Sequence, residues 1–206
     1  MIAQFRNRYC RRNGFLGNWL NPIIGLFSIY LFFSATFAAG AADSVGVVSK
    51  VVNEARIGGA LAVSGAPIHT DDRLRTGAYS RLQVTFRDNS VLTLGEQANV
   101  VVDRYVFDPQ QSKGEVLLNA TQGALRFAGG KLKQMNSKKI TVNTPEAALA
   151  VRGTEFWAGP IDGQYGVLLV TGHVDVSNRA GAVRLSSPGM GTDIPLRHRR
   201  LRKAQR

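Results

Sequence analysis

The segment TPEAALAVRGTEF, residues 144–156, decides between helix and strand for the most distinctive part of the chain. Its first residues favour a helix, because Thr144 can cap an amino terminus, Pro145 fits the first helical position and an acid follows. Gly153 and the β-branched Val151 and Thr154 would end that helix after about two turns, a length at which isolated helices are marginal. We therefore predict a strand, preceded by one turn.

A regular strand through this segment would mix apolar and charged side chains on both faces. A β-bulge at Gly153 would sort them, because it shifts the alternation by one residue and glycine accepts the positive φ that suits a bulge. The apolar face would then carry Leu149, Val151, Thr154 and Phe156. Arg152 and Glu155 would share the other face, where we expect a carboxylate to hold Arg152. The candidate carboxylates are Glu155, Asp71 and Asp72.

The chain on both sides of this segment consists of short alternating stretches. In the clearest hairpin, alternate residues from Leu82 to Phe86 are apolar, and Leu92 and Leu94 return on the same face. Asn89 lies in the turn between them, because asparagine tolerates a left-handed backbone. No window beyond residue 42 keeps a helical period for more than about three turns.

These patterns predict an all-β fold. We expect a single domain, residues 43–192, of short antiparallel strands in a two-layer sandwich or roll. Periodicity leaves a flattened β-solenoid open as the alternative, although the chain shows no exact internal repeat.

The charge of the chain is concentrated at its ends. The 206 residues carry a formal net charge of +12. Residues 1–41 hold four arginines and no acid, and residues 197–206 hold six basic side chains and no acid, which leaves 16 basic and 14 acidic side chains between them. A basic chain raises the expectation of nucleic acid binding, but the predicted domain is nearly neutral. We therefore do not expect a nucleic acid partner.

Residues 1–42 have the order of a secretory signal peptide: arginines, an apolar run over residues 23–37 and small side chains before the first acid. We predict cleavage after Ala41 or Ala42. The alternative is an uncleaved membrane anchor, because residues 23–42 are long enough to span a bilayer. The first prediction gives a periplasmic protein, and the alternative gives an inner-membrane protein whose domain faces the periplasm. The single cysteine, Cys10, lies in the segment that would be removed.

Residues 193–206 form a basic tail, which we expect to be disordered. Its basic side chains could bind an anionic surface such as lipid headgroups. These residues are Arg197, Arg199, Arg200, Arg202, Lys203 and Arg206.

The sequence contains no recognisable catalytic constellation, so we predict a protein that is not an enzyme. The three histidines, His69, His173 and His198, have no metal-ligand spacing. A nucleophile elbow and a phosphate-binding loop are also absent from the sequence. The aromatic residues occur at strand positions that suit a core. We expect no cofactor and no small-molecule substrate.

Several segments in order resemble the FecR family, named for periplasmic regulators of iron-uptake signalling. They are DRLRTG at residues 72–77, residues 80–86, LTLG at 92–95, residues 105–109 and 123–127, residues 144–145 with VRGTEF at 151–156, and residues 172–176. The resemblance implies an extracytoplasmic, β-rich domain without enzymatic activity. It also implies structural roles for Asp72, Arg75, Thr76, Gly77, Thr144, Pro145, Arg152, Gly153, Thr154 and Phe156.

The resemblance has limits. Asn89 stands where the family often has glycine, and residues 147–150 are richer in alanine than the usual β-branched run. The iron-signalling regulators also have a cytoplasmic segment that handles a sigma factor, and we expect the 21 residues before Pro22 to be too few for one. We therefore expect a stand-alone FecR-like module.

Two functions remain open from the sequence. The first is an exported, non-catalytic binding or regulatory module that contacts a protein or an envelope polymer. The alternative is an envelope structural protein that docks to anionic lipid through its arginine-rich tail.

Overall fold

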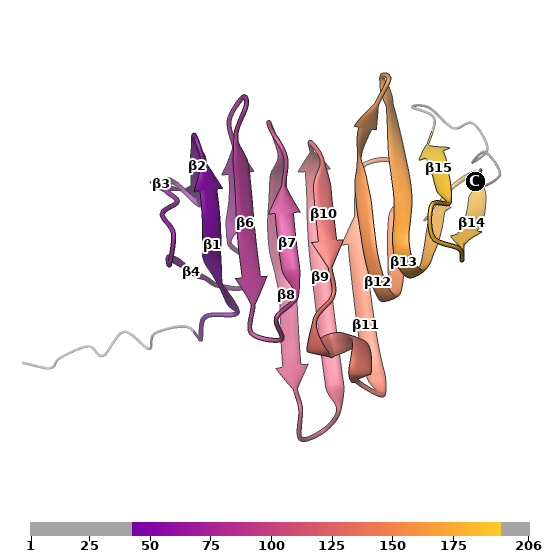
Figure 1. The fold of residues 1–206 in the computed structure, drawn as a ribbon, viewed down its shortest axis with the longest axis horizontal. Coiled ribbons are helices and arrows are strands. Elements are labelled where there is room, and N and C mark those ends of the chain that lie inside the picture. Colours follow the sequence, from indigo (N-terminus) through magenta and orange to yellow (C-terminus); the bar gives the residue numbers. More distant parts are fainter. Residues whose placement is uncertain (1–42, 195–206) are drawn as a thin grey trace, which may run out of the picture. The chain divides into compact units, whose positions relative to one another are not determined.

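The computed structural model describes residues 43–194, and within this range the chain forms fifteen strands and one short 3-10 helix (Figure 1). In chain order these are β1 (Gly46–Val52), β2 (Ala55–Ile57), β3 (Ala60–Leu61), β4 (Pro67–Ile68), β5 (Arg73–Thr76), β6 (Arg81–Phe86), β7 (Val91–Leu94), β8 (Asn99–Asp108), β9 (Lys113–Gln122), β10 (Leu125–Ala128), η1 (Lys131–Gln134), β11 (Ser137–Asn143), β12 (Ala148–Ile161), β13 (Gln164–Asn178), β14 (Gly181–Leu185) and β15 (Gly191–Ile194). The predicted signal peptide and the six basic residues of the tail lie outside the described residues.

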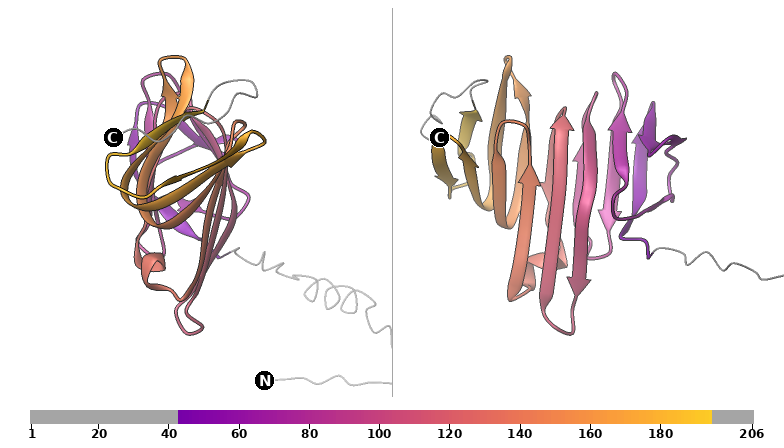
Figure 2. Two further views of the ribbon diagram at one scale, coloured as in Figure 1. Left: turned by 90° about the vertical axis from the view of Figure 1, so that its right-hand side faces the viewer. Right: turned by 180° about the vertical axis from the view of Figure 1, so that it is seen from behind.

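The strands form one continuous sheet that curls back on itself (Figures 1 and 2). One half of the hydrogen-bonded order, β3-β2-β5-β8-β9-β11, forms the back layer in Figure 1, and the other half, β10-β7-β6-β1-β4, forms the front layer. β12 lies between the two halves in this order. The predictions of an all-β fold and of a two-layer roll are confirmed.

One detail of the predicted fold is wrong, because the strands are not all antiparallel. β9 and β11 pair in parallel, from Ser137 opposite Lys113 to Asn143 opposite Asn119. Between these strands the chain crosses to the front layer as β10 and then returns. It therefore re-enters the back layer in the direction of β9, as a crossover connection requires.

β12 joins the two layers because its two halves pair with different strands. Residues 148–151 pair with β11 in the back layer, and residues 155–158 pair with β10 in the front layer. Between these halves Gly153 has a φ of 66°, and the register with β13 shifts on both sides of Glu155. The predicted bulge at Gly153 is confirmed, and it forms the corner where the sheet turns.

β13 follows β12 around this corner. Its own glycine there, Gly172, has a φ of 87° and lies between Thr171 and His173, the partners of Glu155 and Arg152. The outer edge of β13 is divided in the same way as that of β12, since residues 174–178 pair with β14 and residues 165–168 pair with β15. β15 thus extends the folded domain to Ile194, beyond its predicted end at residue 192.

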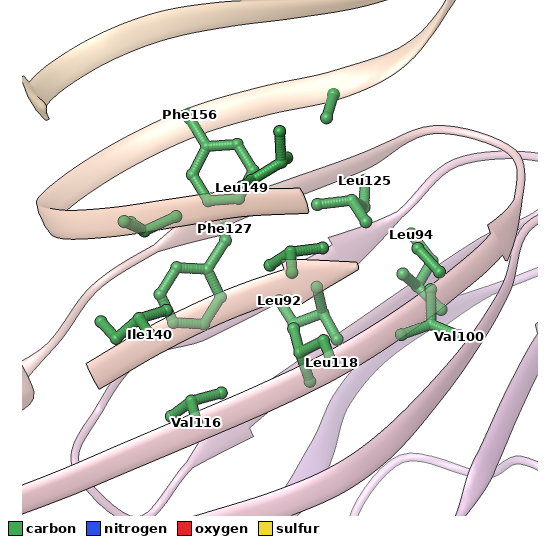
Figure 3. Close-up of a cluster of buried hydrophobic side chains, with 14 of the residues drawn as sticks. Leu92, Leu94, Val100, Val116, Leu118, Leu125, Phe127, Ile140, Leu149 and Phe156 are labelled. Carbon is green, nitrogen blue, oxygen red and sulfur yellow. The ribbon is translucent and has the colours of Figure 1, made fainter. Parts of the chain in front are cut away.

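The core fills the space between the two layers (Figure 3). Phe127 and Phe156 are cross-strand partners whose ring centroids lie 6.2 Å apart, and both are fully buried. Phe86 from the front layer stacks on Tyr105 from the back layer at 5.2 Å. Burying an aromatic side chain of this size contributes about 1.5–3 kcal/mol. The Phe86–Tyr105 contact links the two layers, whereas Phe127 and Phe156 pack within the front layer.

The prediction for residues 144–156 is confirmed, because a turn at 144–147 is followed by a strand from Ala148. Thr144 closes this turn, because its backbone N–H donates to Ala147 O at 2.8 Å and its hydroxyl accepts from Ala147 N at 3.0 Å. The hydroxyl thus makes the contact of a helix cap, but the chain continues as β12. Extension of the chain is favoured because every second side chain of β12 then enters the core.

The predicted apolar face of β12 is confirmed at Leu149, Val151 and Phe156, but the predicted partner of Arg152 is wrong. Leu149, Val151 and Phe156 are buried, whereas Arg152 is exposed. Glu155 forms an ion pair with Arg126 instead, and Asp72 accepts from His69. The hydrogen bond from Arg184 is the main cause that lowers the pKa of Asp175, and the positive charge of Arg152 lowers it further.

The turn between β6 and β7 contains a buried carboxylate, Asp88, with several donors. The Tyr105 hydroxyl donates to Oδ1 at 3.0 Å, Ser90 N donates to Oδ1 at 3.2 Å, and Leu132 N donates to Oδ2 at 3.2 Å. The Ser90 hydroxyl donates to Oδ2 as well. Burial is the main cause that raises the pKa of Tyr105, and the charge of Asp88 raises it further. Asp88 therefore joins the front layer, the back layer and η1. Asn89 beside it has a φ of 64°, as predicted for this turn.

The corner at Gly153 can be tested by substitution. No heavy atom lies within 4 Å of the position that a Cβ would take, so the cost of a side chain there is backbone strain. We expect Gly153→Val to lower the free energy of unfolding by about 1–2 kcal/mol. Gly153→Asn should cost less, because asparagine adopts this conformation more readily. The measurement is equilibrium urea denaturation.

Gly59→Val is the matched control for the corner. That site is equally open, but its φ lies outside the left-handed range. We expect a change within about 0.5 kcal/mol, as for other surface substitutions. Equal costs at residues 59 and 153 would contradict the account of the corner.

The Asp88 cluster gives a second prediction. Asp88→Ala leaves several buried donors without an acceptor, at about 1–3 kcal/mol for each. We expect the free energy of unfolding to fall by at least about 3 kcal/mol. In the control, Asp43→Ala removes a 96% exposed carboxylate that lies 3.7 Å from Arg87, and this change should be nearly neutral. A mild effect of Asp88→Ala would show that the cluster is not a structural centre.

Candidate protein-binding rim

One end of the curled sheet, at the top of Figure 1, is formed by connections between strands, four of which carry the chain between layers. We call these connections the loop rim. They comprise residues 53–54, 77–80, 95–98 and 123–124, together with the turn at 144–147 and the hairpin at 162–163. Backbone hydrogen bonds link neighbouring connections: Gly77 N donates to Glu54 O, Gln97 N to Gly77 O, and Gly95 N to Ala124 O. These bonds join the first four of the connections to one another.

Tyr79 is the most unusual residue of the loop rim. Its side chain is 85% exposed, and its φ is 52°. The left-handed conformation costs a non-glycine residue about 1–2 kcal/mol and is rare for bulky side chains. Tyr79 N donates to Glu96 Oε2 at 3.0 Å, and Asn53 Nδ2 donates to Tyr79 O at 2.6 Å. Side chains from two other connections therefore hold Tyr79 in a strained conformation that presents its ring to solvent.

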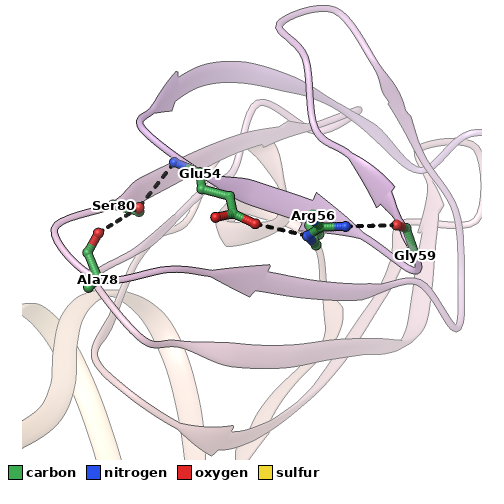
Figure 4. Close-up of polar contacts among 5 residues, drawn as sticks. All are labelled: Glu54, Arg56, Gly59, Ala78 and Ser80. Atoms are coloured by element: carbon green, nitrogen blue, oxygen red, sulfur yellow. Dashed lines mark hydrogen bonds and ion pairs between the residues drawn. The ribbon is translucent and has the colours of Figure 1, made fainter.

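The residues around Tyr79 hold the same connection in place (Figure 4). The buried Ser80 hydroxyl donates to Ala78 O at 2.9 Å and accepts from Glu54 N at 3.1 Å. Arg56 Nε in turn donates to Glu54 Oε1 at 3.0 Å, and the Arg56 guanidinium reaches Gly59 O at 3.3 Å.

Thr76 links the connection at residues 77–80 to the connection at residues 95–98. Its hydroxyl donates to Gly95 O at 2.6 Å and accepts from Ala98 N at 2.8 Å. Its backbone N–H donates to Ala98 O at 3.0 Å. Thr76 is 8% exposed, so these bonds are shielded from water and keep the loop rim rigid.

Three hollows lie along the loop rim. The first, about 430 Å³, is lined by Val52, Tyr79, Ser80, Arg81 and Glu96. The second, about 390 Å³, is lined by Arg75, Thr76, Gln97, Ala98, Asn99 and Gln122. The third, about 270 Å³, shares Gln122 and is lined further by Thr121, Gly123, Pro145, Glu146, Pro160, Gly163, Gln164 and Tyr165. The loop rim therefore offers an uneven surface of the kind that a protein partner can fill.

The structure does not gather the family-motif residues into one site. Thr76 and Gly77 support the loop rim, and Arg75 lines its second hollow. Thr144 and Pro145 form the turn at its far end. Asp72 lies away from the loop rim, where it accepts from His69 N at 2.7 Å and lies 3.5 Å from His69 Nδ1.

The remaining family-motif residues belong to the opposite corner of the sheet. Arg152, Gly153 and the backbone of Thr154 form the bulge, and Phe156 is the first core residue after it. Their positions follow from the turning of β12 between the layers.

The sequence did not single out Tyr79, Glu96 or Asn53. The prediction that aromatic residues occupy core positions is wrong for Tyr79, which is exposed and lies in the connection between β5 and β6. A weak signal was available, because GAYS at residues 77–80 interrupts the alternation between two strands. No local pattern, however, predicts that Glu96 will reach Tyr79 N.

Two further observations concern the described part of the chain. Over residues 43–194, no group of three or more His, Cys, Asp and Glu side chains is arranged to hold a metal ion. Within the same residues, no helix is both long enough and apolar enough to cross a membrane.

Comparison with known proteins supports the resemblance seen in the sequence. The family model described as FecR protein matches residues 72–175, half of the chain, and confirms the predicted family. Two crystal structures of a candidate anti-sigma factor from Parabacteroides distasonis match the fold. One has a TM-score of 0.51 at 20% identity, and the other has 0.49 at 21% identity.

The extent of these matches is limited. In both structures the alignment covers 63% of this chain and 57% of the solved chain. The chain thus spans little more than half the length of the solved protein that it matches. A comparison with curated proteins gives no significant match.

The strain at Tyr79 gives a third prediction. Glycine adopts a left-handed φ without steric cost, although it loses more backbone entropy on folding. We expect Tyr79→Gly to leave the free energy of unfolding unchanged or to raise it by up to about 1 kcal/mol. Thr76→Val, in contrast, should lower it by about 1–3 kcal/mol, because the buried Ala98 N–H loses its acceptor. Thermal and urea denaturation measure both changes, and a destabilised Tyr79→Gly variant would show that the ring serves stability.

Proposed function

Because the chain belongs to the FecR family, we propose that it is a non-catalytic regulatory module of the cell envelope that binds a partner protein through the loop rim. The regulatory role and the envelope location come from the family and from the predicted signal peptide. The binding surface comes from the geometry of the loop rim. The main observation behind this proposal is Tyr79, whose aromatic side chain is exposed although its backbone has a strained, positive φ.

Tyrosine is a suitable anchor for a protein interface. It is one of the residues enriched at binding hot spots, because its ring buries a large area and its hydroxyl can make a hydrogen bond. The bonds from Glu96 and Asn53 fix the backbone of Tyr79 before any partner arrives. Less conformational entropy is therefore lost on binding, which increases affinity.

The surroundings of Tyr79 also suit a protein partner. Val52 is 38% exposed beside the same hollow, and Arg81 and Glu96 bring one charge of each sign to its wall. An apolar centre with a charged surround is the usual arrangement of a protein interface. Strain kept in a native structure commonly marks a functional position, and the fold itself has no need of this ring.

Site-specific crosslinking in intact cells tests the proposed function. A photoreactive amino acid at position 79 should give a discrete adduct with one partner in the envelope fraction. The same amino acid at position 63 is the control, because Val63 is also exposed, at 63%, and lies in the loop before β4 rather than on the loop rim. Equal adduct patterns from the two positions would contradict the proposal.

The crosslinked partner then allows a quantitative test. Loss of a hot-spot side chain typically costs at least about 2 kcal/mol, or roughly thirtyfold in affinity. We expect Tyr79→Gly to weaken binding by this factor while Val63→Ser leaves it unchanged. Because Tyr79→Gly should fold as well as the natural chain, a retained affinity cannot be attributed to misfolding and would exclude Tyr79 as the anchor.

A further inference from the structure

The end of the sheet opposite the loop rim, at the bottom of Figure 1, carries a group of lysines that we call the lysine patch. Residues 131–139, KLKQMNSKK, cover η1 and the start of β11 and contain four lysines and no acid. A further lysine begins β9 and is the cross-strand partner of Ser137. The lysine patch consists of Lys113, Lys131, Lys133, Lys138 and Lys139. Four of these side chains are exposed, and that of Lys133 is half-buried.

The core and several hydrogen bonds hold the lysine patch in place. Leu132, between two of the lysines, is fully buried, and its backbone N–H donates to the Asp88 carboxylate. Lys131 N donates to Asp88 O at 2.7 Å, and Lys138 Nζ donates to Lys133 O at 2.5 Å. The positive charges are therefore presented by an ordered backbone, so little conformational entropy is lost when they meet a partner.

The carboxylates at this end of the sheet do not neutralise the lysine patch. Asp88 is buried in its own cluster, and Glu115 forms an ion pair with Arg104 at 3.3 Å. Asp108 accepts from backbone N–H groups of its own turn. Within residues 43–194, none of the ion pairs includes a lysine. The lysine patch is thus a local excess of positive charge that calls for an anionic partner.

The composition of the lysine patch favours a lipid surface as that partner. Residues 131–139 contain no aromatic side chain on which a nucleic acid base could stack. The three hollows described above are lined by other residues, so they offer no pocket here for an anchor from a folded protein. Lysine ammonium groups are point charges without a fixed fork of donors. Clusters of such charges are attracted to anionic lipid headgroups, whose charge is spread over a plane.

The chain also enters the domain beside the lysine patch. Arg87 N donates to Val45 O at 3.0 Å, and the next residue, Asp88, accepts from Lys131 N. The beginning of the domain and η1 are therefore bonded to the same turn between β6 and β7. A chain that reaches residue 43 from a membrane would bring the lysine patch, and not the loop rim, to the lipid surface. The charge of the patch itself is the same whether or not residues 1–42 are removed.

We propose that the lysine patch docks the domain on anionic phospholipid headgroups, with the loop rim directed away from the membrane. This inference goes beyond the proposed function, because neither Tyr79 nor any other residue of the loop rim takes part in the docking.

Fluorescence quenching in the full chain, reconstituted with lipid vesicles, tests the docking. A fluorophore is attached at position 136 through Asn136→Cys, in a Cys10→Ser background, because Asn136 is exposed in the middle of the lysine segment. The vesicles carry a quencher on the lipid headgroup. We expect strong quenching with phosphatidylglycerol in the vesicles and little with phosphatidylcholine alone. A fluorophore at position 79, through Tyr79→Cys, should be quenched in neither.

Charge variants test whether the lysines cause the approach. Lys131→Gln with Lys133→Gln should shift the equilibrium away from the anionic lipid by up to about thirtyfold. The matched control is Lys50→Gln with Arg179→Gln, which removes the same charge from exposed positions outside the lysine patch. This control should leave the quenching at position 136 unchanged. Added salt should weaken the quenching in the natural chain, because it screens exposed charges.

Three outcomes would overturn the proposal. Quenching at position 136 that is equal in the two lipid compositions, or unchanged by loss of Lys131 and Lys133, would exclude docking by charge. Equal quenching at positions 79 and 136 would exclude the orientation. A label that stays away from both vesicles, while soluble polyphosphate shifts the NMR signals of residues 131–139, would replace the membrane by a soluble polyanion. None of these results depends on the crosslinked partner of position 79, so the proposed function and this inference can fail separately.

Discussion

The fold depends on the corner at which one strand leaves the back layer and enters the front layer. A sheet that curls into two facing layers must either leave open edges or pass a strand from one layer to the other. β12 does the latter, because it closes the edge of β11 with its first half and the edge of β10 with its second half. Gly153 makes this passage through a positive φ, and Gly172 of β13 accompanies it. Phe156, the first core residue after the corner, packs against Phe127 of β10.

Left-handed residues occur at both ends of the sheet, and both ends include glycines and other residues. At the corner they are Gly153 and Gly172, and no heavy atom lies within 4 Å of the Cβ position at Gly153. In three connections of the loop rim the left-handed residues are Asn53, Tyr79 and Gln97, which are not glycines and therefore carry backbone strain. Glycine would serve the backbone equally well in those connections. Tyr79 differs from the other two residues because its side chain is bulky, aromatic and exposed, which points to a role beyond the fold, whereas the corner is explained by the fold alone.

Local patterns in the sequence predict the strands, the turn at Asn89 and the bulge at Gly153, because each depends on the alternation or backbone freedom of neighbouring residues. The parallel pairing of β9 with β11 was not predictable in this way, because it depends on how often the chain changes layers. The same holds for Tyr79, whose exposure depends on Glu96 and Asn53 in other connections. Glu146 and Tyr165 are brought together by the long β12–β13 hairpin, and no spacing in the sequence predicts their common hollow.

The passage of β12 through both layers also determines when the sheet can close during synthesis. A chain that is delivered from its amino terminus forms β1 to β11 first, and until β12 arrives the edges of β10 and β11 have no partner. Both edges belong to the centre of the final sheet, so the incomplete chain presents unpaired backbone and apolar side chains, features that favour association with other chains. A single strand then covers both edges. The two central edges are therefore exposed to association with other chains until residues 148–158 are available to pair with them.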